Sequence, residues 1–129
     1  MNHLMAVKKS YLQRQPEIVE NVLRALIEGL AFTWSPKSKS AVLKSVMRRL
    51  RITEMGLAEE GYQELLTRGG LEKKPYPSLE GMRNVQRLMQ SSTPRIGEIK
   101  LEEIIDRSIM RKLDDSGFID RMYSIYPAK

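Results

Sequence analysis

The sequence predicts a mainly α-helical protein of five to six helices, with at most one short N-terminal strand. Apolar side chains recur at helical spacing along most of the chain, and proline, glycine or serine residues separate the periodic segments. Only residues 4–9 form a strand-like run, and a lone strand is not stable without a partner. The 129 residues contain no internal repeat and suffice for one domain, so we expect residues 1–129 to form a single helical segment.

Residues 16–34 predict the helix around which the other elements are organised. Pro16 suits the first position of a helix, because the N–H at that position has no partner within the helix. Large apolar side chains cover about half of the circumference, whereas a surface helix needs a stripe of roughly 100°. They are Ile18, Val19, Val22, Leu23, Leu26, Ile27, Leu30 and Trp34. We therefore expect this helix to pack against more than one layer.

The remaining periodic segments predict four more helices and two short helical turns. Thr53 and Ser78 are suitable N-cap residues, whereas residues 68–70 and Ser116-Gly117 are suitable helix ends. Two prolines make residues 73–77 an extended linker, and residues 91–97 read as a loop. The predicted helices cover residues 37–50, 53–68, 78–89 and 101–113, and the turns cover residues 10–16 and 118–123.

Positive charge is concentrated in one segment. The net charge is +6, and no acidic residue lies between Gly29 and Thr53, where six lysines and arginines fall. Four of them form a basic stripe on the predicted helix over residues 37–50: Lys37, Lys44, Arg48 and Arg51. The stripe allows a nucleic-acid interface, with Lys44, Arg48 and Arg51 on phosphates, or the solvated back of an amphipathic helix. The second interpretation is favoured, because no aromatic or amide side chains interleave with the cations to read bases.

The residue types that carry catalysis are sparse. The absence of cysteine excludes disulfides, a cysteine nucleophile and thiolate metal sites. His3 is the only histidine and has no ligand partners nearby in the sequence. Glu59-Glu60 and Asp114-Asp115 are neighbours that point about 100° apart on a helix, which favours solvated surface over a proton-sharing pair. Gly69-Gly70 lacks the Lys-Ser/Thr of a phosphate-binding loop. We expect no catalytic residues, no metal, no cofactor and no enzyme activity.

The sequence contains no membrane-spanning segment and no secretory signal. Its longest uncharged run has eight residues, from 29 to 36, and residues 1–7 are too short for a signal core. As written, the chain would therefore stay in the cytoplasm.

Three stretches, in order, resemble one family. They are Ser10-Tyr11-Leu12 with Gln15-Pro16-Glu17-Ile18-Val19 and Leu26-Ile27-Glu28-Gly29; Pro75-Tyr76-Pro77-Ser78-Leu79-Glu80-Gly81-Met82; and Asp106-Arg107-Ser108 with Leu113-Asp114-Asp115-Ser116-Gly117-Phe118-Ile119-Asp120 and Met122-Tyr123. The family is that of the substrate-binding proteins of ABC transporters of the nitrate, sulfonate, taurine and thiamine-precursor-binding type. Nearly the whole chain is covered, and it is similar to the C-terminal helical part of that family's two-lobed α/β periplasmic-binding fold (type II).

The resemblance implies transport of a small-molecule solute to a membrane permease, in the periplasm or at a membrane anchor outside the cytoplasm. It also implies a truncated protein, because the signal, one lobe and most of the other lobe's sheet would lie upstream of Met1. The family's solute contacts come mainly from those parts, so no ligand-binding residue is carried over. Residues 4–9 would be a crossing strand without its sheet.

Two alternative functions remain open beside transport. One is a basic helical module that binds nucleic acid, and the other is a helical module that self-associates. The second follows from the wide apolar face of residues 16–34, because the other helices cannot cover Val19, Leu23, Ile27 and Leu30 together.

Overall fold

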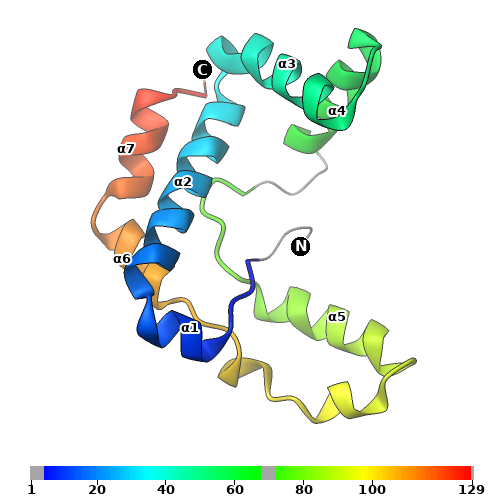
Figure 1. The fold of residues 1–129 in the computed structure, drawn as a ribbon, viewed down its shortest axis with the longest axis vertical. Helices are drawn as coiled ribbons and strands as arrows, with labels where there is room; N and C mark the ends of the chain where they lie inside the picture. The colour runs from blue at the N-terminus through cyan, green and yellow to red at the C-terminus, as the bar shows by residue number, and fades with distance from the viewer. Residues whose placement is uncertain (1–4, 68–71, 129) are drawn as a thin grey trace.

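The computed structural model describes residues 5–67 and 72–128, and this part of the chain consists of helices, turns and connecting segments without a strand. The mainly α-helical fold class is therefore confirmed (Figure 1). The α-helices are α1 (Lys9–Arg14), α2 (Pro16–Trp34), α3 (Lys39–Leu50), α4 (Met55–Thr67), α5 (Leu79–Gln90), α6 (Ser108–Asp115) and α7 (Phe118–Ile125). Short 3-10 helices are η1 (Pro36–Ser38), η2 (Pro94–Glu98) and η3 (Leu101–Glu103).

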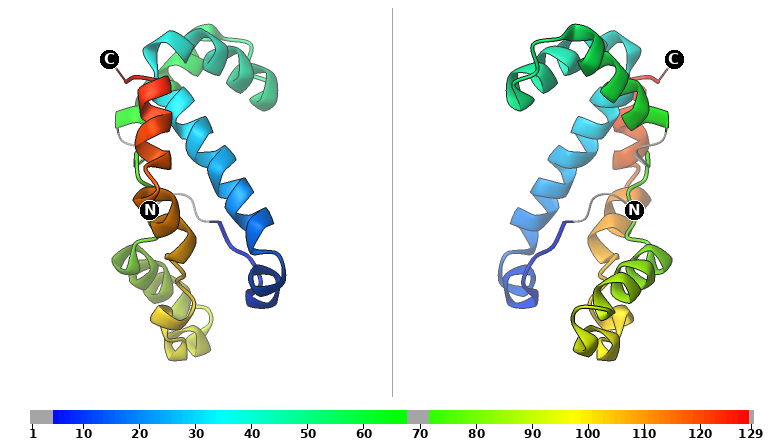
Figure 2. Two further views of the ribbon diagram at one scale, coloured as in Figure 1. Left: turned by 90° about the vertical axis from the view of Figure 1, so that its left-hand side faces the viewer. Right: turned by 90° about the vertical axis from the view of Figure 1, so that its right-hand side faces the viewer.

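Helix α2 is the central element, and the other helices are distributed along it. Helices α6 and α7 pack beside it, α1 adjoins its start, and the α3–α4 hairpin extends from its end (Figures 1 and 2). Helix α5 contacts η2 and η3 and forms an arm at the opposite end from the hairpin. The result is an open arrangement in which α2 is covered along part of its surface.

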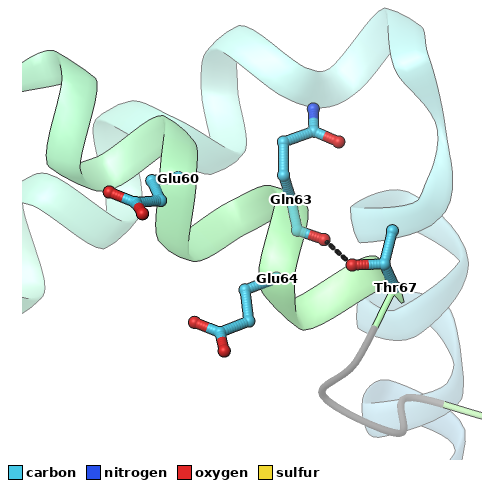
Figure 3. Close-up of a pocket in the computed structure, with 4 residues that line it drawn as sticks. All are labelled: Glu60, Gln63, Glu64 and Thr67. Carbon is cyan, nitrogen blue, oxygen red and sulfur yellow. Dashed lines mark hydrogen bonds between the residues drawn. The ribbon is translucent and has the colours of Figure 1, made fainter.

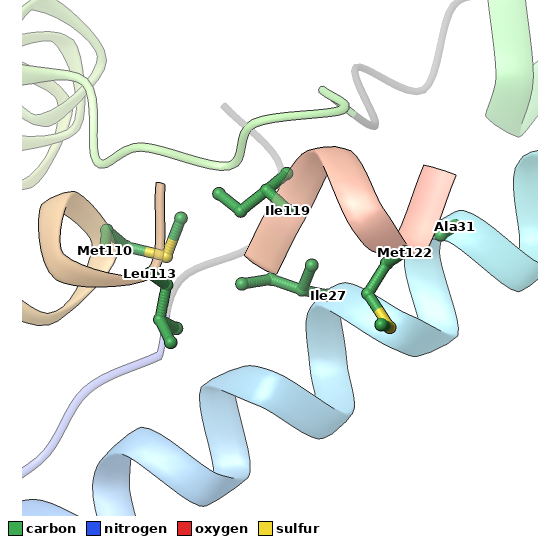
Figure 4. Packing of buried hydrophobic residues seen from close by; sticks show 6 residues of the cluster. All are labelled: Ile27, Ala31, Met110, Leu113, Ile119 and Met122. Atoms are coloured by element: carbon green, nitrogen blue, oxygen red, sulfur yellow. The ribbon is translucent and has the colours of Figure 1, made fainter. Parts of the chain in front are cut away.

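The main hydrophobic core joins α2 to the two C-terminal helices. Figure 4 shows its six buried side chains, which come from α2, α6 and α7: Ile27, Ala31, Met110, Leu113, Ile119 and Met122. Gly117 separates α6 from α7 with φ 69°, a left-handed conformation that glycine adopts without steric cost. That turn folds α7 back so that Ile119 and Met122 reach the side chains of α2.

A second, smaller core holds the α3–α4 hairpin together. It consists of Val42 and Leu43 from α3 with Ala58 and Tyr62 from α4. The Tyr62 hydroxyl donates a hydrogen bond of 2.8 Å to the backbone oxygen of Thr33, which ties the hairpin to the last turn of α2. The hairpin therefore rests on its own core and on one end of α2.

Several predicted boundaries are confirmed and others are wrong. Helix α2 begins at Pro16 and ends at Trp34, as predicted, and Ser78 caps α5 by accepting a 3.0 Å hydrogen bond from the Gly81 N–H. Helix α4 begins at Met55, so its N-cap position falls on Glu54 and not on Thr53. The region predicted as a strand has none over residues 5–8, and Lys9 already belongs to α1. A single unpaired segment has no ladder to stabilise it as a strand.

The predicted helix over residues 101–113 is also wrong. Its apolar positions have helical spacing, but the chain forms η3, then irregular backbone, and then α6 from Ser108. Asp106 accepts hydrogen bonds from the Ser108 N–H at 2.8 Å and the Ser108 hydroxyl at 2.5 Å. This local turn competes with the helical backbone bonds and starts a new helix. The predicted loop over residues 91–97 likewise contains part of η2.

Helix α2 buries one part of its apolar surface and exposes another. Val19, Ile27 and Ala31 are buried, and Leu23 packs against the main core. The exposed apolar side chains lie four residues apart, at Ile18 (46% exposed), Val22 (45%) and Leu26 (51%). We call these three residues the outer face of α2. The expectation that part of the apolar surface stays uncovered holds, but the sequence assigned it to the wrong residues.

Candidate functional site

The basic stripe lies on the exposed side of α3, as the sequence predicts. Lys37, Lys44, Arg48 and Arg51 are all exposed, and none has a carboxylate within ion-pair distance in the described part of the chain. Lys39 differs, because it pairs with Glu59 of α4 and lies 6.0 Å from the centre of the Tyr62 ring. The free cations form a positive surface, whereas Lys39 has a structural partner.

Two shallow hollows lie on the surface of the described residues. One, of about 300 Å³, is lined by Glu60, Gln63, Glu64 and Thr67, and Figure 3 shows both of its carboxylates on one side of α4. The other, of about 260 Å³, is lined by Glu17, Glu20, Asn21 and Lys112. Both are polar and open to solvent, whereas solute sites bury most of the ligand in an apolar cleft with few polar groups. Neither hollow has the form of a solute site.

One polar cluster lies where the linker over residues 73–77 meets α6. Asp114 accepts hydrogen bonds from the Lys74 ammonium at 2.6 Å and from the Tyr76 hydroxyl at 2.8 Å. Both bonds hold the pKa of Asp114 below its ordinary value, with the lysine the larger cause. Arg107 donates a hydrogen bond of 2.7 Å to the backbone oxygen of Pro77. These contacts fasten the linker to the start and the end of α6.

A second cluster ties α2 to α6 and α7. Glu20 accepts hydrogen bonds from Lys112 at 2.6 Å and from Arg24 at 2.7 Å, and these partners lower its pKa, Lys112 more than Arg24. The Arg24 guanidinium lies 4.6 Å from the centre of the Phe118 ring. The Tyr126 hydroxyl donates a 3.2 Å hydrogen bond to Glu28. The four-residue spacing of Glu20 and Arg24 predicts an ion pair on one helix face, and this pair is confirmed as part of a larger cluster.

Lys73 occupies an aromatic corner between the linker, α2 and α7. Its ammonium lies 5.7 Å from the ring centres of both Trp34 and Tyr123, at cation–π distance. The Tyr123 hydroxyl donates a 2.9 Å hydrogen bond to the Lys73 backbone oxygen, and burial raises the pKa of Tyr123 to about 12. Tyr123 therefore stays protonated at neutral pH and acts as a hydrogen-bond donor here.

Replacing Asp114 should loosen the linker from α6. Asp114→Ala removes the acceptor of Lys74 and Tyr76, so we expect a fall of several degrees in the melting temperature measured by circular dichroism. Because the folded state lowers the pKa of Asp114, its contribution is present above the unfolded-state pKa and disappears as the pH falls through the folded-state value. The difference between the wild-type chain and the variant should therefore vanish in acid.

Asp115→Ala is the matched control for this prediction. Asp115 is the exposed neighbour on the same helix and has no ion-pair partner among the described residues. Its replacement should leave the melting temperature nearly unchanged. Equal effects of the two substitutions at neutral pH would contradict the role assigned to Asp114.

The positions singled out in the sequence are distributed over separate parts of the structure. His3, Arg68 and Gly69-Gly70 lie outside the described residues. Asp114 is not free solvated surface, because it has two hydrogen-bond partners, whereas Asp115 is exposed. The four-residue spacing of Glu103 and Arg107 also predicts an ion pair, but this pair is not formed because the segment is not one helix; a carboxylate oxygen of Glu103 instead lies 3.6 Å from the Lys100 ammonium.

The sequence contained no direct signal for the Lys74–Tyr76–Asp114 cluster, because its members lie up to 40 residues apart.

The described residues hold no group of three or more histidine, cysteine, aspartate or glutamate side chains that could bind a metal ion. Within the same ranges, no helix combines the length and apolar character needed to cross a bilayer. The polar clusters described above join the linker to α6, and α2 to α6 and α7, through hydrogen bonds and ion pairs. We therefore interpret them as contacts that stabilise the fold.

The comparisons with known proteins give no match. No protein-family model matches the chain, no curated protein matches it significantly, and no solved structure matches it significantly.

Proposed function

We propose that this chain is the C-terminal helical part of the solute-binding component of an ABC transport system. The complete protein would capture a small molecule outside the cytoplasm, in the periplasm or at a membrane anchor, and deliver it to a membrane permease. The chain would form the helical wall of a lobe, and the parts that contact solute would lie upstream. No residue of the chain is assigned a catalytic role or a cofactor.

The contacts among the three motif segments carry this proposal. The stretch with Pro75-Tyr76-Pro77 meets the stretch beginning at Asp106 through the bonds Tyr76–Asp114 and Arg107–Pro77. Lys112 and Glu20, which fall between the matched parts of the last and the first stretch, also contact each other. Segments that resemble one family in sequence order are thus also neighbours in space, as parts of one architecture would be. The exposed outer face of α2 adds support, because a further layer would cover it.

The DNA upstream of the Met1 codon tests the proposal. We expect an in-frame stretch that encodes alternating strands and helices, preceded by a lipoprotein or secretory signal. An in-frame stop codon close to Met1, with a ribosome-binding site in front of Met1, would contradict the proposal.

The isolated chain should not bind solutes of the implied classes. We expect no heat in calorimetric titrations with nitrate, sulfonates, taurine or pyrimidine precursors, because the hollows of the described residues are shallow and open. The product of the extended reading frame, titrated in parallel, is the positive control. A one-site isotherm with the isolated chain would mean that the helical part holds a complete site.

Self-association is a second candidate function, and one observation favours it. The outer face of α2 places Ile18, Val22 and Leu26 four residues apart on one helix, and each is about half exposed. Contiguous apolar surface of this kind marks an interaction site or an aggregation hazard. In the isolated chain, a second copy could cover this face.

A further inference from the structure

The connection between α3 and α4 carries exposed apolar side chains at the free end of the hairpin. We call residues 48–57 the hairpin tip; Figure 1 places it away from the core formed by α2, α6 and α7. Leu50 is 67% exposed, Met55 is 51% exposed and Leu57 is 56% exposed. Three large apolar side chains within eight residues thus face solvent at the end of a hairpin.

Three arginines lie in the same segment as these apolar side chains. Arg48, Arg49 and Arg51 are exposed, and in the described ranges none lies within ion-pair distance of a carboxylate. Arg51 ends α3 in the left-handed conformation, with φ 57°, and its N–H bonds to the Met47 oxygen. The chain therefore turns sharply at Arg51, and the charged and apolar side chains are gathered at one tip. Glu54 is the one acidic residue of the tip.

We propose that the hairpin tip docks on a bilayer surface that contains anionic lipids. Apolar side chains that enter the headgroup boundary and guanidinium groups that meet lipid phosphates together give interfacial binding. The unpaired arginines supply the charge complementarity for an anionic surface. A nucleic-acid duplex fits less well, because it would leave the exposed leucines and methionine without a partner. This inference does not depend on the transport proposal.

Co-sedimentation of the full 129-residue chain with vesicles tests the charged component. We expect binding to vesicles of phosphatidylcholine with phosphatidylglycerol, and little binding to phosphatidylcholine alone. Arg48→Gln with Arg49→Gln should lower the partition coefficient about 30-fold, since each basic residue near an anionic surface raises that coefficient about fivefold. The matched control, Arg87→Gln with Arg95→Gln, removes the same charge from exposed positions elsewhere and should change binding by no more than about twofold.

A second pair of variants tests the apolar component. Leu50→Gln with Leu57→Gln should weaken binding about tenfold or more, because both side chains are exposed in solution and would be buried in the interface. Leu88→Gln with Ile104→Gln changes exposed apolar residues outside the tip and should have no effect. Circular dichroism spectra of all variants show whether each remains folded.

Three results would overturn the proposal. The first is no preference for anionic vesicles over neutral ones. The second is equal loss of binding in the tip variants and their folded controls, which would indicate a general effect of charge or hydrophobicity. The third is that duplex DNA binds the chain more tightly than the vesicles do and competes with them, and that this competition is lost when Arg48 and Arg49 are replaced. The tip would then be a nucleic-acid interface.

Discussion

Ile27→Asp should unfold this chain, whereas Leu26→Asp should leave it folded. The two residues are neighbours on α2, yet Ile27 is fully buried in the core with α6 and α7, and Leu26 is 51% exposed. A carboxylate at Ile27 would be placed among apolar side chains without a partner, at a cost above about 4 kcal/mol. That is comparable to the whole stability of a small domain, about 5–15 kcal/mol.

The substitution at Leu26 is the matched control. It introduces the same residue one position earlier on the same helix, so its cost is limited to helix propensity and lost surface contacts, about 1 kcal/mol or less. Thermal melts followed by circular dichroism distinguish the two outcomes. Two similar melts would contradict the assignment of inner and outer faces on α2.

Polar residues on the outer face of α2 should convert the isolated chain from an associating species to a monomer. We expect the wild-type chain to sediment as dimers or larger species, because Ile18, Val22 and Leu26 present a contiguous apolar row. With all three replaced by glutamine, the chain should sediment as a 14.9 kDa monomer with an unchanged helical spectrum. Sedimentation velocity over a range of concentrations measures the difference.

A control pair on α5 shows whether the outer face is responsible. Leu88 is 76% exposed and Met89 is 48% exposed, on a helix distant from α2 in the chain. Their replacement by glutamine should leave the association unchanged. Loss of association in this control, or a wild-type chain that is already monomeric, would contradict the role of the outer face.

Local signals predicted those parts of the fold that local chemistry determines. Pro16 begins α2, Ser78 caps α5, and Gly117 follows the end of α6 in a conformation suited to glycine. Each of these residues acts within a few positions of itself along the chain. The boundaries that depend on them were therefore accessible from the sequence.

Predictions failed where a periodic pattern had to compete with another contact. Residues 101–113 have helical spacing, yet the turn made by Asp106 with Ser108 divides them. Here a local side-chain arrangement prevailed over the apolar period. Helix α3, in contrast, ends at Leu50 as predicted, although Arg51 takes a left-handed conformation that is typical of glycine or asparagine.

Burial on α2 and the contacts of Asp114 could not be read from the sequence for a different reason. Spacing identifies which side chains of α2 are apolar, but the positions of α6 and α7, about 90 residues later, decide that Ile27 is covered and Leu26 is not. Asp114 likewise meets Tyr76 across 38 residues. Such long-range contacts depend on the tertiary arrangement and produce no periodic pattern in the sequence.

The labelling rate of a single cysteine at Val22 tests the central claim that the outer face of α2 receives a further layer in a longer protein. The chain has no cysteine of its own, so in Val22→Cys a maleimide reports on one position, and full labelling in denaturant provides the reference. We expect rapid labelling of the isolated chain at low concentration and strong protection in the product of the extended reading frame. Equal labelling rates in the two proteins, or the absence of such a reading frame, would contradict it.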